Sequence, residues 1–260
     1  MIFEPEDQQI FSNLIDILGR EAMAGHGISK LAAEAGRHFL GARYAANILE
    51  CRPEQLVINL RVFDCFTFVE NAVVLAGLAC TERHGFQAYA KALRMSRYKG
   101  GWIDGYPSRL HYFTDWIYEN ARRGILKDLT RALGGKSFRK KIHFMTSNRD
   151  RYPGIQDENA YNRMKEAEKR ISRRIRYEIP AEMLPTLEDH IGEGNIIAIL
   201  TDREGLDCLH VGMAIRKGSR LHLIHASEKA GAVIISPQTL TAYLAGGNNR
   251  TGILIARMAS

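Results

Sequence analysis

The strongest constraint on the fold is a change of pattern at residue 194. After it, short apolar runs alternate with turn residues, which is typical of β-strands that follow one another in a meander. The runs cover residues 196–201, 210–216, 221–227, 232–236 and 252–258. A short helix is expected over 237–245, before the last run. Closely spaced strands usually pair antiparallel, so this part of the chain predicts an antiparallel sheet.

The part of the chain before residue 194 carries helical patterns instead. Residues 6–20 place apolar side chains at i, i+4, i+7 and i+8, the spacing of one helix face. We also expect a helix over 29–40 with Ser29 as its N-cap, a buried helix over 65–80, and a helix over 108–123 that Ser108 caps and Gly124 ends. Residues 56–63 are expected to be extended. Helices first and an antiparallel sheet last predict an α+β class. We expect one domain over 1–260, with an irregular insertion near 134–162.

Composition excludes several classes of protein. The 260 residues are 45% hydrophobic and 25% charged, as in a globular protein that needs no disulfides to hold its core. The net charge of +7 favours acidic partners. The basic runs at 139–141 and 165–176 lack interleaved aromatics, so they predict a solvated face and no nucleic-acid partner. The four cysteines form no CxxC pair and no zinc spacing, so we expect no disulfide, metal or cofactor.

Targeting signals are not evident. No apolar run reaches the ~18 residues of a membrane span. The first residues are acidic, unlike a signal peptide. Two interpretations follow: a cytoplasmic protein, or a periplasmic one whose leader has been trimmed.

The most distinctive local feature is the pair Asp64-Cys65, where an extended segment meets the buried helix. A thiol at a helix N-terminus faces the positive end of the helix dipole, which favours the nucleophilic thiolate. A cysteine nucleophile needs a base, and the late strands offer His210 and His225. On neighbouring antiparallel strands these imidazoles can hydrogen-bond, so that one orients the other. The alternative is that Cys65 is a small core residue.

A resemblance favours the first interpretation. The string FLGARY at 39–44, the pair Asp64-Cys65, HVGMAI at 210–215 and IHAS at 224–227 occur in this order. Together they resemble the NlpC-type cell-wall peptidases, a papain-like family. In detail the chain resembles the N-acetylmuramoyl-L-alanine amidase-like branch, because residues 64–70 replace the usual Asp-Cys-Ser-Gly and because 108–112, 143–145 and 205–212 also look like that branch. Asn195 departs from the resemblance, since an acidic residue is more usual there.

The resemblance implies roles for individual residues. Cys65 would attack the amide carbonyl, His210 would act as general base and acid, and His225 would orient His210. The Cys65 N–H and the Tyr44 hydroxyl are candidates for oxyanion stabilisation. The candidate substrate-binding residues are Arg109, as a carboxylate clamp on the first turn of a helix, and His111, Tyr112, His143, Asp64 and Thr67. Glu70 is expected as a buried acceptor or a substrate group, and His222 as structural.

The implied activity is hydrolysis of the bond between the muramic-acid lactyl group and L-Ala in peptidoglycan fragments. One alternative is a D-Glu–diamino-acid endopeptidase of the same fold, which the replaced Asp-Cys-Ser-Gly motif disfavours. A zinc amidase using His210, His225 and Cys208 lacks an HExxH motif and a third well-spaced ligand. A non-catalytic wall-binding module would not need the Cys and His set. The expected partners are peptidoglycan fragments, and the expected state is a monomer.

Overall fold

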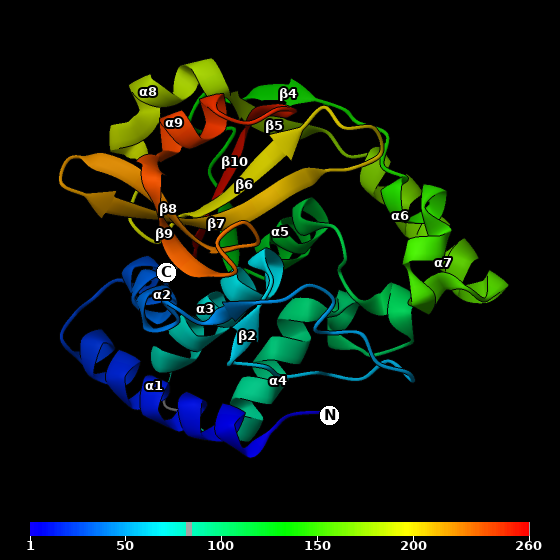
Figure 1. The fold of residues 1–260 in the computed structure, drawn as a ribbon, viewed down its shortest axis with the longest axis horizontal. Helices are drawn as coiled ribbons and strands as arrows, with labels where there is room; N and C mark the ends of the chain where they lie inside the picture. The colour runs from blue at the N-terminus through cyan, green and yellow to red at the C-terminus, as the bar shows by residue number, and fades with distance from the viewer. Residues whose placement is uncertain (82–84, 260) are drawn as a thin grey trace.

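A computed structural model describes residues 1–81 and 85–259, and within them one ten-stranded sheet forms the centre of the molecule (Figure 1). Its strand order is β2-β1-β9-β8-β7-β6-β10-β5-β4, with β3 also paired to β10. The strands are β1 (Arg43–Tyr44), β2 (Val62–Phe63), β3 (Leu126–Asp128), β4 (Lys136–Phe138), β5 (Arg176–Pro180), β6 (Ile196–Thr201), β7 (Cys208–Lys217), β8 (Arg220–Ser227), β9 (Ala232–Thr239) and β10 (Arg250–Met258). The strands of the predicted meander, β6 to β9, are antiparallel neighbours in chain order.

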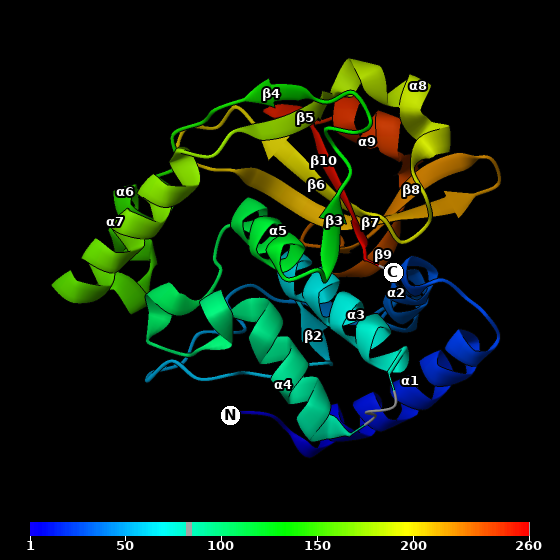
Figure 2. The same ribbon diagram turned by 180° about the vertical axis from the view of Figure 1, so that it is seen from behind.

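Helices cover both faces of this sheet. They are α1 (Pro5–Met23), α2 (Ile28–His38), α3 (Cys65–Ala79), α4 (Phe86–Arg97), α5 (Phe113–Arg122), α6 (Phe144–Ser147), α7 (Glu158–Ser172), α8 (Leu184–Leu187) and α9 (Leu240–Ala245). Helices α1 to α4 lie on one side of the sheet and α8 and α9 on the other (Figure 1). Both views show α6 and α7 projecting at one edge (Figure 2). The predicted α+β class is therefore confirmed.

The central strand β6 is apolar on both of its faces because helices cover both sides of the sheet. In β6, Ile196 and Ala198 pack toward the core under α1 to α5, whereas Ile197 and Ile199 pack toward α8 and α9. This alternation follows from the two-residue period of a strand. It explains why β6 appears in the sequence as a continuous apolar run and not as an alternating one.

Helix α3 passes through the larger core. Twelve of its fifteen residues are buried. An apolar helix of this kind is stable only when protein surrounds it on most sides, and α1, α2 and α4 supply that surrounding (Figure 2). Its first residue is Cys65, so the burial of the whole helix sets the position of this thiol. No helix within residues 1–81 and 85–259 is long and apolar enough to cross a membrane.

Several predicted elements require correction. Helix α2 begins at Ile28 after the N-cap Gly27, so Ser29 lies inside it. Of residues 56–63, only Val62 and Phe63 are assigned to a strand. Residues 134–162 are not irregular throughout, since they contain β4, α6 and the start of α7.

The predicted helix over 108–123 begins only at Phe113. Ser108 ends a short 3-10 turn, and its hydroxyl donates to the Gly105 carbonyl at 2.6 Å without capping a helix. Arg109 then bridges to Tyr98 in antiparallel fashion, and the Leu110 N–H donates to the Arg97 carbonyl at 2.9 Å. These backbone bonds to a distant segment hold the chain extended, which no local pattern reveals.

The basic run at 165–176 is only partly a solvated face. Arg174 forms ion pairs with Asp115 and Glu119 and is largely buried. Arg176 is also buried, and one of its guanidinium nitrogens donates to the Lys140 carbonyl at 2.8 Å. These two arginines tie α7 and β5 to the rest of the molecule.

Candidate active site

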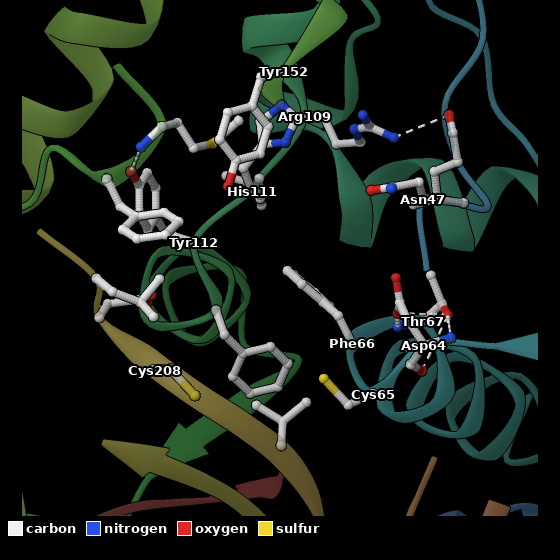
Figure 3. Close-up of a pocket in the computed structure, with 18 of the residues that line it drawn as sticks. Asn47, Asp64, Cys65, Phe66, Thr67, Arg109, His111, Tyr112, Tyr152 and Cys208 are labelled. Atoms are coloured by element: carbon white, nitrogen blue, oxygen red, sulfur yellow. Dashed lines mark hydrogen bonds between the residues drawn. The ribbon is translucent and has the colours of Figure 1, made fainter. Parts of the chain in front are cut away.

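Cys65 is the first residue of α3, and a capping box fixes it there. The Asp64 carboxylate accepts from the Thr67 N–H at 2.7 Å and from the Thr67 hydroxyl at 2.8 Å, and the Asp64 N–H donates to that hydroxyl at 3.1 Å. Figure 3 shows these bonds beside the Cys65 sulfur. Thr67 is 2% exposed. Asp64 and Thr67, predicted to bind substrate, are therefore engaged mainly in holding the helix start.

The two histidines lie together where β7 and β8 separate. The register of these strands runs from Lys217↔Arg220 to Met213↔Ile224, and both histidines lie beyond that last pair. His210 Nε2 and His225 Nδ1 are 2.6 Å apart, and the rings are nearly perpendicular at 85°. The predicted imidazole pair is thus present, with one shared proton between its nitrogens.

Cys65 and His210 line the same cavity of about 520 Å³. Its walls come from the segment 47–50, the start of α3, residues 106–113, residues 144–145 and 151–153, and residues 206–211. In Figure 3 the Cys65 sulfur projects into the open space, with Cys208 across from it on β7. His225 lies behind His210 and is 2% exposed. The arrangement places a thiol and an imidazole at one surface, with a second imidazole in support.

Burial sets the protonation of these groups. It raises the pKa of Cys65 to about 12, with a further contribution from Asp64, while a backbone hydrogen bond from Val211 opposes the rise. Burial, then His225 and Arg250, lower the pKa of His210 to about 3. Burial therefore opposes the thiolate that the helix dipole favours. Both shifts favour a neutral thiol and a neutral imidazole, in which case the sulfur would lose its proton as it attacks.

Tyr44 lies on β1, close enough to Cys65 for the two to interact electrostatically. Burial, then Cys65, Glu228 and Asp64, raise the pKa of Tyr44 to about 12. The phenol therefore keeps its proton at neutral pH and can act as a donor. An oxyanion donor needs this state, but Tyr44 is not among the residues that line the cavity, and its oxyanion role stays a prediction.

Arg109 does not have the environment expected of a carboxylate clamp. It lies before α5 and not on its first turn, and it is 6% exposed. Its guanidinium donates to the Leu49 carbonyl at 3.1 Å and to Glu50 at 2.6 Å, and it lies 3.6 Å from Glu54. The charge is thus neutralised within the protein. Arg109 holds the 47–54 segment against the cavity, so we assign it a structural role.

We expect Arg109→Lys to act on stability. A single ammonium cannot span the Glu50 carboxylate, the Leu49 carbonyl and the vicinity of Glu54 as the planar guanidinium does, so the midpoint of thermal unfolding should fall by the equivalent of ~1–3 kcal/mol. The matched control is Arg163→Lys, because Arg163 is half-exposed and pairs with the exposed Asp104. An unchanged midpoint together with a large loss of kcat/KM would instead support the predicted role of Arg109 in binding a substrate carboxylate.

His111 and Tyr112 also line the cavity but are held by internal bonds. His111 Nε2 lies 2.9 Å from the Tyr106 carbonyl, and burial, then Arg109, hold the pKa of His111 well below its usual range. The Tyr112 hydroxyl donates to Glu168 at 2.6 Å and accepts from the Met145 N–H at 3.0 Å. Both residues shape the wall of the cavity, and the Tyr112 hydroxyl and the Nε2 atom of His111 are already bonded within the protein.

His143 is not among the residues that line the cavity. Its Nδ1 lies 2.8 Å from the Ser147 hydroxyl, and its Nε2 lies 3.6 Å from the exposed Glu204. His143 is the N-cap residue of α6, and the structure does not bring it to the cavity wall where substrate binding was predicted. His222 is buried, with Nδ1 2.9 Å from the Ser236 carbonyl, as fits a structural role.

Other wall residues had no signal in the sequence. Asn47 adopts a left-handed backbone conformation with φ 59°, and Arg151 and Tyr152 come from the turn before α7. These residues lie far from Cys65 in the chain, and only the fold brings them together. Within the described ranges no group of three or more His, Cys, Asp or Glu side chains is placed to hold a metal ion.

The fold and the cavity define an α+β protein with a cysteine at a helix N-terminus beside a strand-borne histidine pair. This class of architecture agrees with sequence comparison. The profile of the AmiA-like family, described as N-acetylmuramoyl-L-alanine amidase-like, matches residues 34–253, and the chain belongs to this family. None of the curated proteins matches the chain.

Solved structures extend this similarity. An N-acetylmuramoyl-L-alanine amidase from Bacteroides uniformis ATCC 8492 is 35% identical, with a TM-score of 0.85 over 90% of this chain and 99% of that one. A putative xylanase from Bacteroides fragilis is 34% identical, with a TM-score of 0.82 over 86% of this chain and 99% of that one. Protein LPG0564 from Legionella pneumophila, of family DUF1460, is 22% identical with a TM-score of 0.71 over 97% of this chain and 95% of that one, and shares the fold.

Proposed function

We propose that this protein is a cysteine-dependent N-acetylmuramoyl-L-alanine amidase with a papain-like, NlpC-type arrangement. It would hydrolyse the amide between the muramic-acid lactyl group and L-Ala in peptidoglycan fragments. The observation that carries the proposal is that Cys65 and His210 line one cavity in a chain of the AmiA-like family. The name of the Bacteroides uniformis relative supports the same bond.

The proposed chemistry starts from a neutral thiol and a neutral imidazole, the state that burial favours. His210 takes the thiol proton while the Cys65 sulfur attacks the lactyl carbonyl carbon, which gives a tetrahedral oxyanion. The Cys65 N–H and the Tyr44 hydroxyl are the candidate donors to that oxygen. When the intermediate collapses, the C–N bond breaks, the L-Ala nitrogen takes the proton from His210, and a thioester remains on Cys65. Water then attacks the thioester with His210 as base, releasing the muramoyl acid and restoring the thiol.

The cavity also suits a peptide with a sugar at one end. Its wall combines apolar rings, such as Phe66 and Phe113, with polar groups, as binding sites for small molecules usually do. Arg151 lies at its exposed edge, whereas the guanidinium of Arg97 is paired with Glu70. A stem peptide carries carboxylates, for which a solvent-accessible guanidinium is a suitable partner.

Mass spectrometry of the products from a disaccharide-tetrapeptide tests the proposed bond. We expect free disaccharide and an intact tetrapeptide beginning with L-Ala. A main product with L-Ala–D-Glu still attached to the sugar would identify the endopeptidase instead. Xylan serves as a second substrate because of the name of the Bacteroides fragilis relative, and release of xylose oligomers would contradict the amidase assignment.

The zinc alternative is disfavoured by the direction of the imidazole nitrogens. His210 Nε2 and His225 Nδ1 face each other at 2.6 Å, which leaves no room for an ion between them. Activity that is lost on chelation and restored by zinc would reverse this conclusion.

We further propose that the protein acts in the periplasm, because peptidoglycan fragments arise there. Fractionation of cells that produce the native gene product, followed by immunodetection, tests this. Recovery of the protein in the cytoplasmic fraction alone would contradict the periplasmic proposal and would mean that its substrates are fragments imported into the cytoplasm.

A further inference from the structure

One buried nitrogen of the histidine pair lacks a hydrogen-bond partner. His225 Nδ1 is engaged by His210 Nε2 at 2.6 Å, but His225 Nε2 is buried and makes no hydrogen bond. A buried polar atom without a partner costs free energy unless the surrounding protein compensates for it. The residues around this nitrogen therefore help decide where the protons of the pair reside.

The tautomer of His225 controls whether His210 can act as a base. If His210 Nε2 carries the shared proton, then His210 Nδ1 has the free lone pair that can accept the thiol proton, and His225 must carry its own proton on Nε2. In the opposite tautomer His225 Nδ1 donates, and the proton of His210 lies on Nδ1, where it blocks proton transfer. The unpartnered nitrogen must therefore be an N–H for the site to work.

Tyr243 of α9 lies against this pair. Its ring centroid is 5.5 Å from that of His225, with an interplanar angle of 75°, and 6.3 Å from that of His210. The face of an aromatic ring is negative, so it attracts an N–H and repels a nitrogen lone pair. His225 and Tyr243 meet in a near-perpendicular contact, and a Tyr243 face turned toward Nε2 would favour the tautomer with the proton on that nitrogen.

Arg250 packs against Tyr243. Its guanidinium carbon is 4.3 Å from the Tyr243 ring centroid, and one of its nitrogens donates to the Tyr243 carbonyl. Gly247 makes room for this side chain, since a Cβ at that position would overlap it. Tyr243 of α9, Gly247 of the following turn and Arg250 at the start of β10 thus pack together beside the histidine pair.

Arg250 of β10 is the charged side chain that acts on both rings. Tyr243 of α9 contacts both rings, whereas Asp64, next to α3, acts on the pKa of Cys65. Burial, followed by Arg250, lowers the pKa of His225 to about 4, and Arg250 also contributes to the lowered pKa of His210. A fixed positive charge at this place therefore opposes protonation of both rings.

We propose that Tyr243 and Arg250 are positioning residues that select the working tautomer of the His210–His225 pair and keep both rings uncharged. The proposal rests on the function proposed above for Cys65 and His210. It adds that Tyr243 and Arg250, which do not line the cavity, keep His210 able to accept a proton at mildly acidic pH.

The first test is the pH profile of kcat/KM for Arg250→Gln. The acid limb should move to higher pH by on the order of one unit, because removing a nearby like charge has an effect of that size. Gly247→Ala should move the limb in the same direction by displacing the Arg250 side chain. The control is Arg257→Gln on the same strand, an exposed residue that should leave the limb in place. An unmoved limb in both Arg250→Gln and Gly247→Ala would overturn the role of Arg250.

The second test uses the ring. Tyr243→Leu should lower kcat about three- to tenfold, as expected for loss of one aromatic contact, and Tyr243→Phe should recover most of that loss because the ring face remains. Equal losses in the two variants would show that the hydroxyl acts instead of the ring face, and would overturn the role of Tyr243.

Nitrogen-15 NMR of the imidazoles makes the test independent of turnover. In the full-length protein at pH 5 we expect neutral rings, with the His225 proton on Nε2, and a shift toward charged rings in Arg250→Gln. A His225 proton on Nδ1 in the wild type would overturn the proposal. If the NMR result is as expected but no peptidoglycan fragment is cleaved, the proposed function fails and the positioning unit stands.

Discussion

Cys65→Ala is expected to reduce hydrolysis of peptidoglycan fragments by at least ~10³-fold while the protein remains folded. The covalent route has no substitute for the sulfur, and loss of a nucleophile removes most of the rate that a Cys-His unit supplies. The structural cost is small, because the change deletes one atom at the edge of a cavity and should lower the free energy of unfolding by only ~1 kcal/mol. Initial rates and thermal unfolding on the same preparations separate the two effects.

The other end of α3 provides a matched control. Cys80 follows the same helix at its C-terminus and is exposed to solvent. Cys80→Ala should therefore keep wild-type rates. Turnover by Cys65→Ala above a few per cent of wild type would remove Cys65 from the mechanism, since no other nucleophile is proposed.

Glu70→Ala is expected to have the largest effect on stability. Glu70 and Arg97 are 1% and 3% exposed, and their side chains meet at 2.7 and 2.8 Å. Burial raises the pKa of Glu70, and the Arg97 guanidinium beside it opposes that rise. Removing the carboxylate leaves a buried positive charge without its partner, which typically costs ~3–5 kcal/mol. Urea unfolding should show a lower midpoint with an unchanged slope.

A surface pair calibrates this result. Glu166 pairs with Lys169 at 2.6 Å on α7, and both side chains are largely exposed. Glu166→Ala should leave the urea midpoint unchanged, because solvent screens such pairs. A Glu70→Ala variant as stable as the wild type would mean that Glu70 and Arg97 are held by their packing and not by their charges.

The sequence predicted the elements whose burial pattern is local. Strands β6 to β10 lie where apolar runs between turn residues predicted them, and α3 begins at Cys65 as its apolar run indicated. The same reasoning failed at residues 108–112, where a serine with cap-like spacing precedes an extended segment bound to Tyr98 and Arg97. Such a segment is defined by partners more than ten residues away, so its own sequence contains no periodicity that reveals it.

By itself the sequence determined the α+β class, the place of Cys65 at a helix start and the identity of the two histidines, because each depends on hydrophobic period or on a short motif. Only the tertiary structure determined which side chains near them are paired within the protein and which charge state burial favours. Arg109 has the chemistry of a clamp, yet Glu50 and Glu54 neutralise it. Cys65 has the position of a thiolate, yet burial raises the pKa of its thiol. Burial and ion pairing depend on residues brought together from distant parts of the chain, so the charge state and role of a side chain are properties of the fold and not of its neighbours in sequence.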